Sequence, residues 1–209
     1  MPGMECCLRT QKQTWNRTKS VTFQHAPRVN HRFNSLTINR LGLWLFLVSD
    51  ASFFLALLSS RFFVVGTTTP EDVDQFLGLG LTVLLLLSSL TAYRAEASAE
   101  RGDLSGVKQM LLATIVMGIV FVLGVGYEWH EAFKHFPPST GFGTVLFTLT
   151  GVHVTHVVTG VLVLVLVYLR VNRTDSAIDN RWGVEGAVKW WHFVDVAWVF
   201  IYPTLYLIR

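Results

Sequence analysis

Five long runs of apolar side chains divide the sequence, and they constrain its fold more than any other feature. A helix needs roughly 20 such residues to cross the hydrocarbon core of a membrane. Runs of about that length occupy residues 41–65, 76–93, 107–127, 141–169 and 188–208. Only 15% of the 209 residues are charged, whereas 51% are hydrophobic. We therefore predict an all-α membrane domain of five transmembrane helices over residues 41–209, with no second globular domain.

Residues 1–40 form a basic tail that precedes the first apolar run. Among their charged side chains, Glu5 is the single acidic one. A polybasic flank before a first span is usually a topology signal, so we expect no nucleic-acid partner. We expect no signal peptide either, because the tail contains no apolar run. Cys6 and Cys7 are neighbours that rarely bridge each other, and we expect two free thiols.

The charges of the loops predict the orientation of the chain, because Lys and Arg accumulate on the cytoplasmic side. The loop between the first and second runs is acidic, and the loop between the third and fourth carries only Lys134. The loops after the second and fourth runs are basic and carry Arg94, Arg101, Lys108, Arg170, Arg173 and Arg181. We predict a cytoplasmic N-terminus and a C-terminus on the outside.

Several ionisable side chains fall within the apolar runs or at their edges, where each needs a protein partner or a function. The candidates are Asp50, Glu128, His153, His156, His192 and Asp195. Counted from Leu41 at the rise of an α-helix, Asp50 lies about 14 Å into the bilayer. Two interpretations stay open for it: a carboxyl group linked to proton movement, or a hydrogen-bonding group that joins two helices.

The histidines allow two further hypotheses. His153 and His156 share one helical face, as do His192 and Asp195. A histidine–carboxylate pair between the fourth and fifth runs is geometrically reasonable. Ligation of a haem between two helices is the alternative, but the histidines of the two runs lie at unequal depths. Three or four convergent ligands for zinc or copper are not evident. We predict no catalytic residue, metal or cofactor on this chain.

Four segments together resemble subunit III of the haem-copper oxidases, over nearly the whole of residues 41–209. The last helix of that family is similar to residues 191–202, WHFVDVAWVFIY. Its first core helix, with a Ser-(Glu/Asp) signature, resembles residues 42–50, GLWLFLVSD, which continue through Phe53 and Phe54. The other two resemblances lie in residues 128–131, EWHE, and residues 150–157, TGVHVTHV. Five spans fit the short bacterial form of the family.

The resemblance implies a non-redox subunit of a proton-pumping terminal oxidase in the inner (plasma) membrane of a bacterium. Haem and copper would reside in partner subunits I and II, and small subunits are further partners. The chain would brace subunit I, hold phospholipids and support proton uptake. Candidates for contact with lipids or partners are Trp190, Trp191, His192 and Trp198. Asp50 occupies a place where many members of the family have glutamate, and Pro203 interrupts a stretch that is usually aliphatic.

The electron donor stays open between cytochrome c and quinol, and subunits of this type also occur in some nitric oxide reductase clusters. The HFVDV run at residues 192–196 favours the cytochrome c branch. Outside this family, the remaining hypotheses are a free-standing haem-b electron carrier and a small transporter. A transporter would be favoured by an internal repeat, which the five runs do not show.

Overall fold

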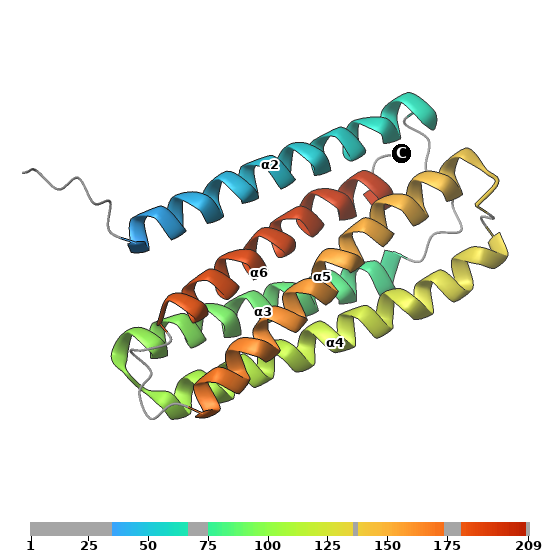
Figure 1. Cartoon of the computed structure of the whole chain (residues 1–209). Helices are drawn as coiled ribbons and strands as arrows, with labels where there is room; N and C mark the ends of the chain where they lie inside the picture. The colour runs from blue at the N-terminus through green and yellow to red at the C-terminus, as the bar shows by residue number, and fades with distance from the viewer. Residues whose placement is uncertain (1–34, 67–74, 136–137, 174–180, 208–209) are drawn as a thin grey trace, which may run out of the picture. The chain divides into compact units, whose positions relative to one another are not determined.

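The computed structural model describes residues 35–66, 75–135, 138–173 and 181–207 (Figure 1). Within these ranges the chain is entirely helical, which confirms the all-α class. The helices are α2 (Ser35–Val64), α3 (Gln75–Arg101), α4 (Leu104–His135), α5 (Gly141–Arg173) and α6 (Arg181–Tyr202), and α6 continues into a π-helical turn, η2 (Pro203–Leu207). The predictions for Cys6, Cys7 and the acidic loop lie outside the described residues.

Helices α3, α4, α5 and α6 pack against one another in a ring of neighbours, and α2 lies beside α5 and α6 (Figure 1). The interior of this bundle is filled by large side chains that are fully buried, among them Phe121, Trp191 and Trp198. Only 11% of the apolar stretch of α2 is buried, compared with 28–33% in α3, α4 and α5. α2 is therefore the peripheral helix of the chain.

Four of the described helices, α2 to α5, are long and apolar enough to cross a membrane. α6 has 22 residues but carries Glu185, Lys189 and Asp195 among them. These charges interrupt its apolar stretch, and α6 is not among the four candidate spans, so the fifth span stays a prediction. Hydropathy also placed several helix ends too early. α3 and α4 each continue for eight residues past the apolar runs that predicted them, to Arg101 and His135.

The turn between α3 and α4 shows how the sequence ends one helix and begins the next. Gly102 has a φ of 75°, in the left-handed region that a residue without Cβ adopts readily. The Oδ1 atom of Asp103 then accepts hydrogen bonds from the backbone N–H groups of Ser105 and Gly106, each at 3.1 Å. This is an N-cap, which satisfies donors in the first turn of α4. The tight connection makes α3 and α4 antiparallel neighbours.

Hydroxyl groups of α3 hold the indole rings of α6. The Nε1 atom of Trp191 donates to the Ser88 hydroxyl at 2.9 Å, and that of Trp198 donates to the Thr82 hydroxyl at 3.0 Å. A buried indole N–H needs such a partner, because hydrocarbon offers none. These bonds fix the rotation of α6 against α3, which positions the polar residues of α6 described below.

Candidate functional site

A carboxylate–histidine pair joins α2 to α5 within the apolar part of both helices. The Nε2 atom of His156 lies 3.3 Å from Oδ1 and 3.2 Å from Oδ2 of Asp50. The two side chains are 14% and 19% exposed, for Asp50 and His156 respectively. The sequence had suggested a pair between the fourth and fifth runs. The structure instead pairs the fourth run with the first, because α2 lies beside α5 and brings Asp50 to the depth of His156.

The hydrogen-bond partners of His156 limit where the protons of this pair can lie. Its Nδ1 atom lies 2.7 Å from the carbonyl oxygen of Val152. A carbonyl oxygen only accepts, so Nδ1 carries a hydrogen. A hydrogen bond between Nε2 and Asp50 then needs one further proton, either on Nε2 as an ion pair or on the carboxyl group as a neutral pair. The geometry therefore provides one proton position between two groups.

Aromatic rings surround the pair and separate it from polar neighbours. The ring of Phe54 lies 5.0 Å from that of His156 in an edge-on contact, and the indole of Trp190 stacks on His156 at 5.9 Å. Trp190 in turn stacks on Phe46 of α2 at 5.3 Å. Such apolar surroundings strengthen the electrostatic interaction between Asp50 and His156.

His153 lies one turn from His156 and is fully buried. Its ring contacts Phe54, Phe121 and Trp198, with centroid distances between 5.0 and 6.3 Å. Neither ring nitrogen has a hydrogen-bond partner within the part of the chain that the structure describes. Within this chain the imidazole of His153 therefore packs in the core between α2, α4 and α6.

On α6, His192 and Asp195 lie one helical turn apart and face α3. The Nδ1 atom of His192 lies 2.6 Å from the Ser89 hydroxyl. Asp195 is 3% exposed, and neither of its oxygens has a hydrogen bond of good geometry among the described residues. Ser89 lies close enough to Asp195 to interact with it, but its hydroxyl is already bonded to His192. The two α6 residues thus form a second polar cluster, separate from the Asp50–His156 pair.

Glu128, the remaining carboxylic acid of the predicted set, lies near the end of α4 and is 9% exposed. The hydroxyl group of Tyr206 donates a hydrogen bond to its Oε1 atom. The side-chain amide of Gln75 donates to the backbone carbonyl of Tyr206 at 3.3 Å. Glu128 therefore ties the π-helical turn after Pro203 to α4, while Gln75 ties it to α3.

Charged residues connect the helices at the end of the bundle where α2 and α6 begin, which is the predicted cytoplasmic end. Arg40 of α2 donates to Glu185 of α6 at 2.8 Å, and Lys189 also pairs with Glu185. Burial acts to raise the pKa of Glu185, but the hydrogen bonds and charges of Arg40 and Lys189 outweigh it and lower the pKa. The ionised carboxylate is thus held between two cations.

At the opposite end, Arg61 fastens α2 to α5. Its side chain is 1% exposed, lies 5.5 Å over the ring of Phe142, and donates to the backbone carbonyl of Gly66 at 2.8 Å. α2 is consequently attached at three levels, by Arg40, Asp50 and Arg61.

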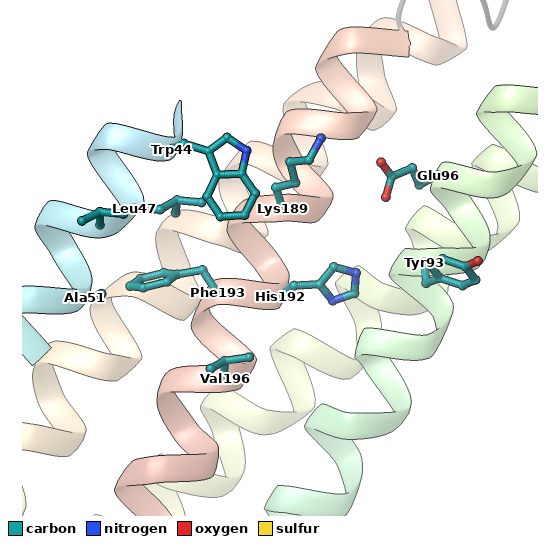
Figure 2. A pocket seen from close by; sticks show the side chains of 10 residues that line it. Trp44, Leu47, Ala51, Tyr93, Glu96, Lys189, His192, Phe193 and Val196 are labelled. Carbon is teal, nitrogen blue, oxygen red and sulfur yellow. The ribbon is translucent and has the colours of Figure 1, made fainter. Parts of the chain in front are cut away.

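Two of the grooves beside α2 lie along its first half, one on each flank. The first lies between α2, α5 and α6, has a volume of about 380 Å³, and is lined in part by Phe46, Arg170, Trp182 and Trp190. The second lies between α2, α3 and α6 and has a volume of about 520 Å³ (Figure 2). His192 lines this second groove.

The aromatic candidates divide between surface and core. Trp190 lines the first groove, and its contact with lipids or partners stays a prediction. Trp191 and Trp198 are fully buried and bond to α3, so within this chain they pack the core. Sequence reasoning missed Tyr206, Ser88, Ser89 and the Arg40–Glu185 pair. Tyr206 follows His192 and Asp195 at helical spacing, and this indicates that it faces protein. Nothing in the sequence indicates its partner on α4.

These features define a polytopic membrane subunit whose helices are joined by buried polar pairs. No group of three His, Cys, Asp or Glu side chains converges in the described ranges to hold a metal ion. The family model for cytochrome c oxidase subunit III matches residues 8–208. The chain therefore belongs to the cytochrome c oxidase subunit III family, and is a membrane subunit of a haem-copper oxidase.

Individual relatives agree with this family. A cytochrome c oxidase subunit 3 from Corynebacterium diphtheriae is 30% identical, over 88% of this chain and 95% of the relative. A probable cytochrome c oxidase subunit 3 from Mycobacterium leprae is 29% identical, over 86% and 92% respectively. The corresponding subunit of Hippopotamus amphibius is 30% identical, over 98% of this chain and 81% of its own length.

Proposed function

We propose that this chain is the non-redox subunit III of a proton-pumping terminal oxidase in a bacterial inner membrane, with its N-terminus in the cytoplasm. In this role it braces subunit I, holds phospholipids and supports the uptake of protons. Haem and copper reside in subunits I and II, and cytochrome c is the electron donor. The family match supports the oxidase assignment, and the Asp50–His156 pair is the observation that carries the proton-linked part.

The pair suits a proton-linked role because its proton has two possible positions. It lies either on Nε2 of His156 or on the carboxyl group of Asp50, and the exchange moves it only along one hydrogen bond. An isolated carboxylate at this depth would be costly, but a histidine partner makes the ionised form accessible. The same contact also joins α2 to α5, so the pair has a structural role in addition.

Substitution of Asp50 separates these two roles. Asp50→Asn keeps a hydrogen-bonding group of similar size but cannot release a proton, whereas Asp50→Glu keeps the carboxyl group. We expect both variants of the intact oxidase to assemble, and only Asp50→Asn to lower turnover and the number of protons taken up per electron. The measurements are oxygen consumption and proton movement in reconstituted vesicles.

A different result would remove the proton-linked role. If Asp50→Asn leaves turnover and proton stoichiometry unchanged and impairs only assembly, the pair serves solely to join the two helices. The amount of subunits I and II that copurifies with each variant reports assembly independently of turnover.

The groove between α2, α5 and α6 supports the proposal that the chain holds phospholipids. Arg170 lies in the last turn of α5 at the predicted cytoplasmic end, where a lipid phosphate would be located. Apolar side chains such as Leu43 and Val163 continue the lining. Gly186 leaves part of its wall open, because no atom lies within 4 Å of where a Cβ would be.

The identity of the electron donor is tested on the intact complex. Mass spectrometry of the purified oxidase identifies the subunits that accompany this chain. A partner subunit with the ligands of a dinuclear copper centre supports cytochrome c as donor, whereas a subunit without them supports quinol.

A further inference from the structure

Trp190 borders both the Asp50–His156 pair and the first groove, which lies between α2, α5 and α6. The groove begins near Arg170 at the predicted cytoplasmic end, and Trp190 is among its lining residues. Neither Asp50 nor His156 lines it. The indole of Trp190 also stacks on the imidazole of His156, with 5.9 Å between the ring centroids. The indole is therefore part of the wall that separates the pair from the groove.

The lining residues of this groove end on each of the three helices before the pair is reached. The innermost ones are Phe46 on α2, Val163 on α5 and Trp190 on α6. Asp50 lies one turn beyond Phe46, about 6 Å further along the helix, and His156 lies about two turns beyond Val163. The rings of Phe46 and Trp190 are stacked at 5.3 Å. These two rings together close the inner end of the groove toward the pair.

Gly160 lets the indole of Trp190 lie directly against α5. A Cβ atom added at Gly160 would lie 3.2 Å from both Cδ1 and Nε1 of Trp190, which is closer than an ordinary van der Waals contact. Small residues at such points allow membrane helices to approach closely. Because Gly160 follows His156 by one turn, this approach places the indole beside the imidazole on which it stacks.

The contacts of Trp190 within the described ranges are ring contacts, not hydrogen bonds of its indole. Its Nε1 atom is buried and has no hydrogen-bond partner in the part of the chain that the structure describes. The indoles of Trp191 and Trp198, in contrast, each donate to a hydroxyl group of α3. A buried indole N–H usually has such a partner. The shape of the Trp190 ring therefore matters here, and another aromatic ring can take its place.

We propose that Trp190 is a positioning residue for the Asp50–His156 pair. Its indole holds the plane of the imidazole so that Nε2 stays directed at Asp50, and it separates the shared hydrogen bond from water that enters the groove. Water beside the pair would offer the proton other acceptors and would weaken the interaction between the two groups. The inference rests on the proposed proton-linked role of the pair and adds a residue of α6 to it.

The first test measures water beside His156 in the intact oxidase. Hydroxyl radicals generated from water by X-ray radiolysis oxidise the side chains that adjoin that water, and peptide mass spectrometry locates the oxidised residues. Trp190→Ala leaves a cavity that borders the imidazole and opens to the groove, and a roomy cavity with polar walls holds water. We expect the oxidation of His156 to increase severalfold in Trp190→Ala and to stay at the wild-type level in Trp190→Phe.

Two controls distinguish a local opening from a general loosening of the bundle. His153 is fully buried one turn from His156, so its oxidation should stay low in every variant. Trp44→Ala removes an indole that lines the second groove, on the other flank of α2, and is expected to leave the oxidation of His156 unchanged. Unchanged oxidation of His156 in Trp190→Ala would overturn the inference, as would equal increases at His153 and His156.

A second test asks whether Trp190 acts through the pair. We expect Trp190→Ala to lower the number of protons taken up per electron in reconstituted vesicles, by no more than Asp50→Asn does, and Trp190→Phe to retain it. In the Asp50→Asn background, Trp190→Ala should cause no further loss, because both substitutions act on the same hydrogen bond. An additive loss would contradict the inference. If Asp50→Asn alone has no effect, the proton-linked role is wrong, whereas the oxidation of His156 still decides whether Trp190 separates the pair from water.

Discussion

At the scale of single residues, several polar groups inside the bundle are paired with groups from other helices. His156 bonds to Asp50, His192 to Ser89 and Trp191 to Ser88, and each bond crosses between two helices. In hydrocarbon an unpaired polar group has no water to replace its partner. Each such bond therefore selects one relative rotation of the two helices that it joins.

Tyr206 offers a direct measure of one such bond. Tyr206→Phe removes the hydroxyl group that donates to Glu128 and leaves a buried carboxyl group with one partner fewer. We expect the substitution to lower stability by on the order of 1 kcal/mol, which is typical for a hydrogen bond between helices. The measurement is the thermal unfolding midpoint of the purified complex in detergent.

Tyr202→Phe is the control for this substitution. Tyr202 stacks on Tyr206 at 5.2 Å and is also buried, so the two substitutions change similar surroundings. We expect Tyr202→Phe to leave the midpoint nearly unchanged. If both variants shift it equally, the Tyr206 hydroxyl contributes nothing specific through Glu128.

Sequence reasoning identified which residues are polar inside the membrane, but it could not identify their partners. A carboxyl group at mid-bilayer is costly, so Asp50 can be identified as a candidate from the sequence alone. Its partner, however, depends on which helices are neighbours and how each is rotated. The sequence offers His153, His156 and His192 as partners for Asp50, and only the position of α2 beside α5 selects His156.

At the scale of the helices, glycine controls how closely α4 approaches α6. A Cβ atom added at Gly118 would lie 2.6 Å from Cη2 of Trp191 and 2.8 Å from a methyl group of Val161. Trp191 cannot move away freely, because its indole is bonded to Ser88. Small residues at such contacts let membrane helices pack closely.

Gly118→Ala is therefore expected to destabilise the chain by about 1–3 kcal/mol, as overpacking of a filled core does. Gly126→Ala on the same helix is the matched control, since nothing lies within 4 Å of its added Cβ. There the higher helix propensity of alanine predicts no loss of stability. Equal destabilisation by both substitutions in thermal unfolding would refute the close α4–α6 contact.

The attachment of α2 to α6 is expected to depend on pH through Glu185. Its pKa is lowered in the folded protein, so the ionised form stabilises the fold above the ordinary value of 4.5. This contribution disappears as the pH falls through the lowered pKa. Glu185→Gln removes it at every pH.

We thus expect the difference in unfolding midpoint between wild type and Glu185→Gln to be constant from neutral pH down to about 4.5 and to vanish in more acidic buffer. A difference that persists unchanged below the lowered pKa would show that Glu185 acts by packing and not by charge.

The apolar runs predicted the helices well in number but less well in extent. Hydropathy detects the part of a helix that lies in hydrocarbon, whereas the backbone bonds of α3 and α4 continue into polar residues such as Glu96 and Glu131. For α6 the start was predicted seven residues too late, because its first two turns contain Arg181, Glu185 and Gly186. The α-helical part of α6 ends at Tyr202, directly before Pro203, and the chain continues as the π-helical turn η2.

At the scale of the whole molecule, the predicted orientation is the property that most needs a direct test. We expect a cysteine at Ser139, between α4 and α5, to react with a membrane-impermeant maleimide in intact spheroplasts. A cysteine at Ser105, at the start of α4, should react only after the membrane is opened. Cys6 and Cys7 are replaced by serine in both variants so that only the introduced thiol reports. The reverse pattern of labelling would invert the topology.

The overall arrangement of the helices was beyond sequence reasoning for a physical reason. Apolar side chains are equally compatible with lipid and with another helix, so hydropathy does not reveal which faces meet. α2 and α3 are consecutive, yet α2 is fastened by its polar residues to α5 and α6. The family match identifies the oxidase to which the chain belongs, whereas the structure identifies the contacts between its helices.

The attachment of α2 to late helices has a consequence for biogenesis. Asp50 meets His156 across 106 positions of sequence, so the helix that is synthesised first finds its partner near the end of translation. At roughly 5–20 residues per second, this delay lasts on the order of 5–20 s. During that interval the nascent α2 resides in the membrane with its carboxyl group unmatched, which favours a protonated form. The polar contact between α2 and α5 can therefore form only after α5 has been synthesised.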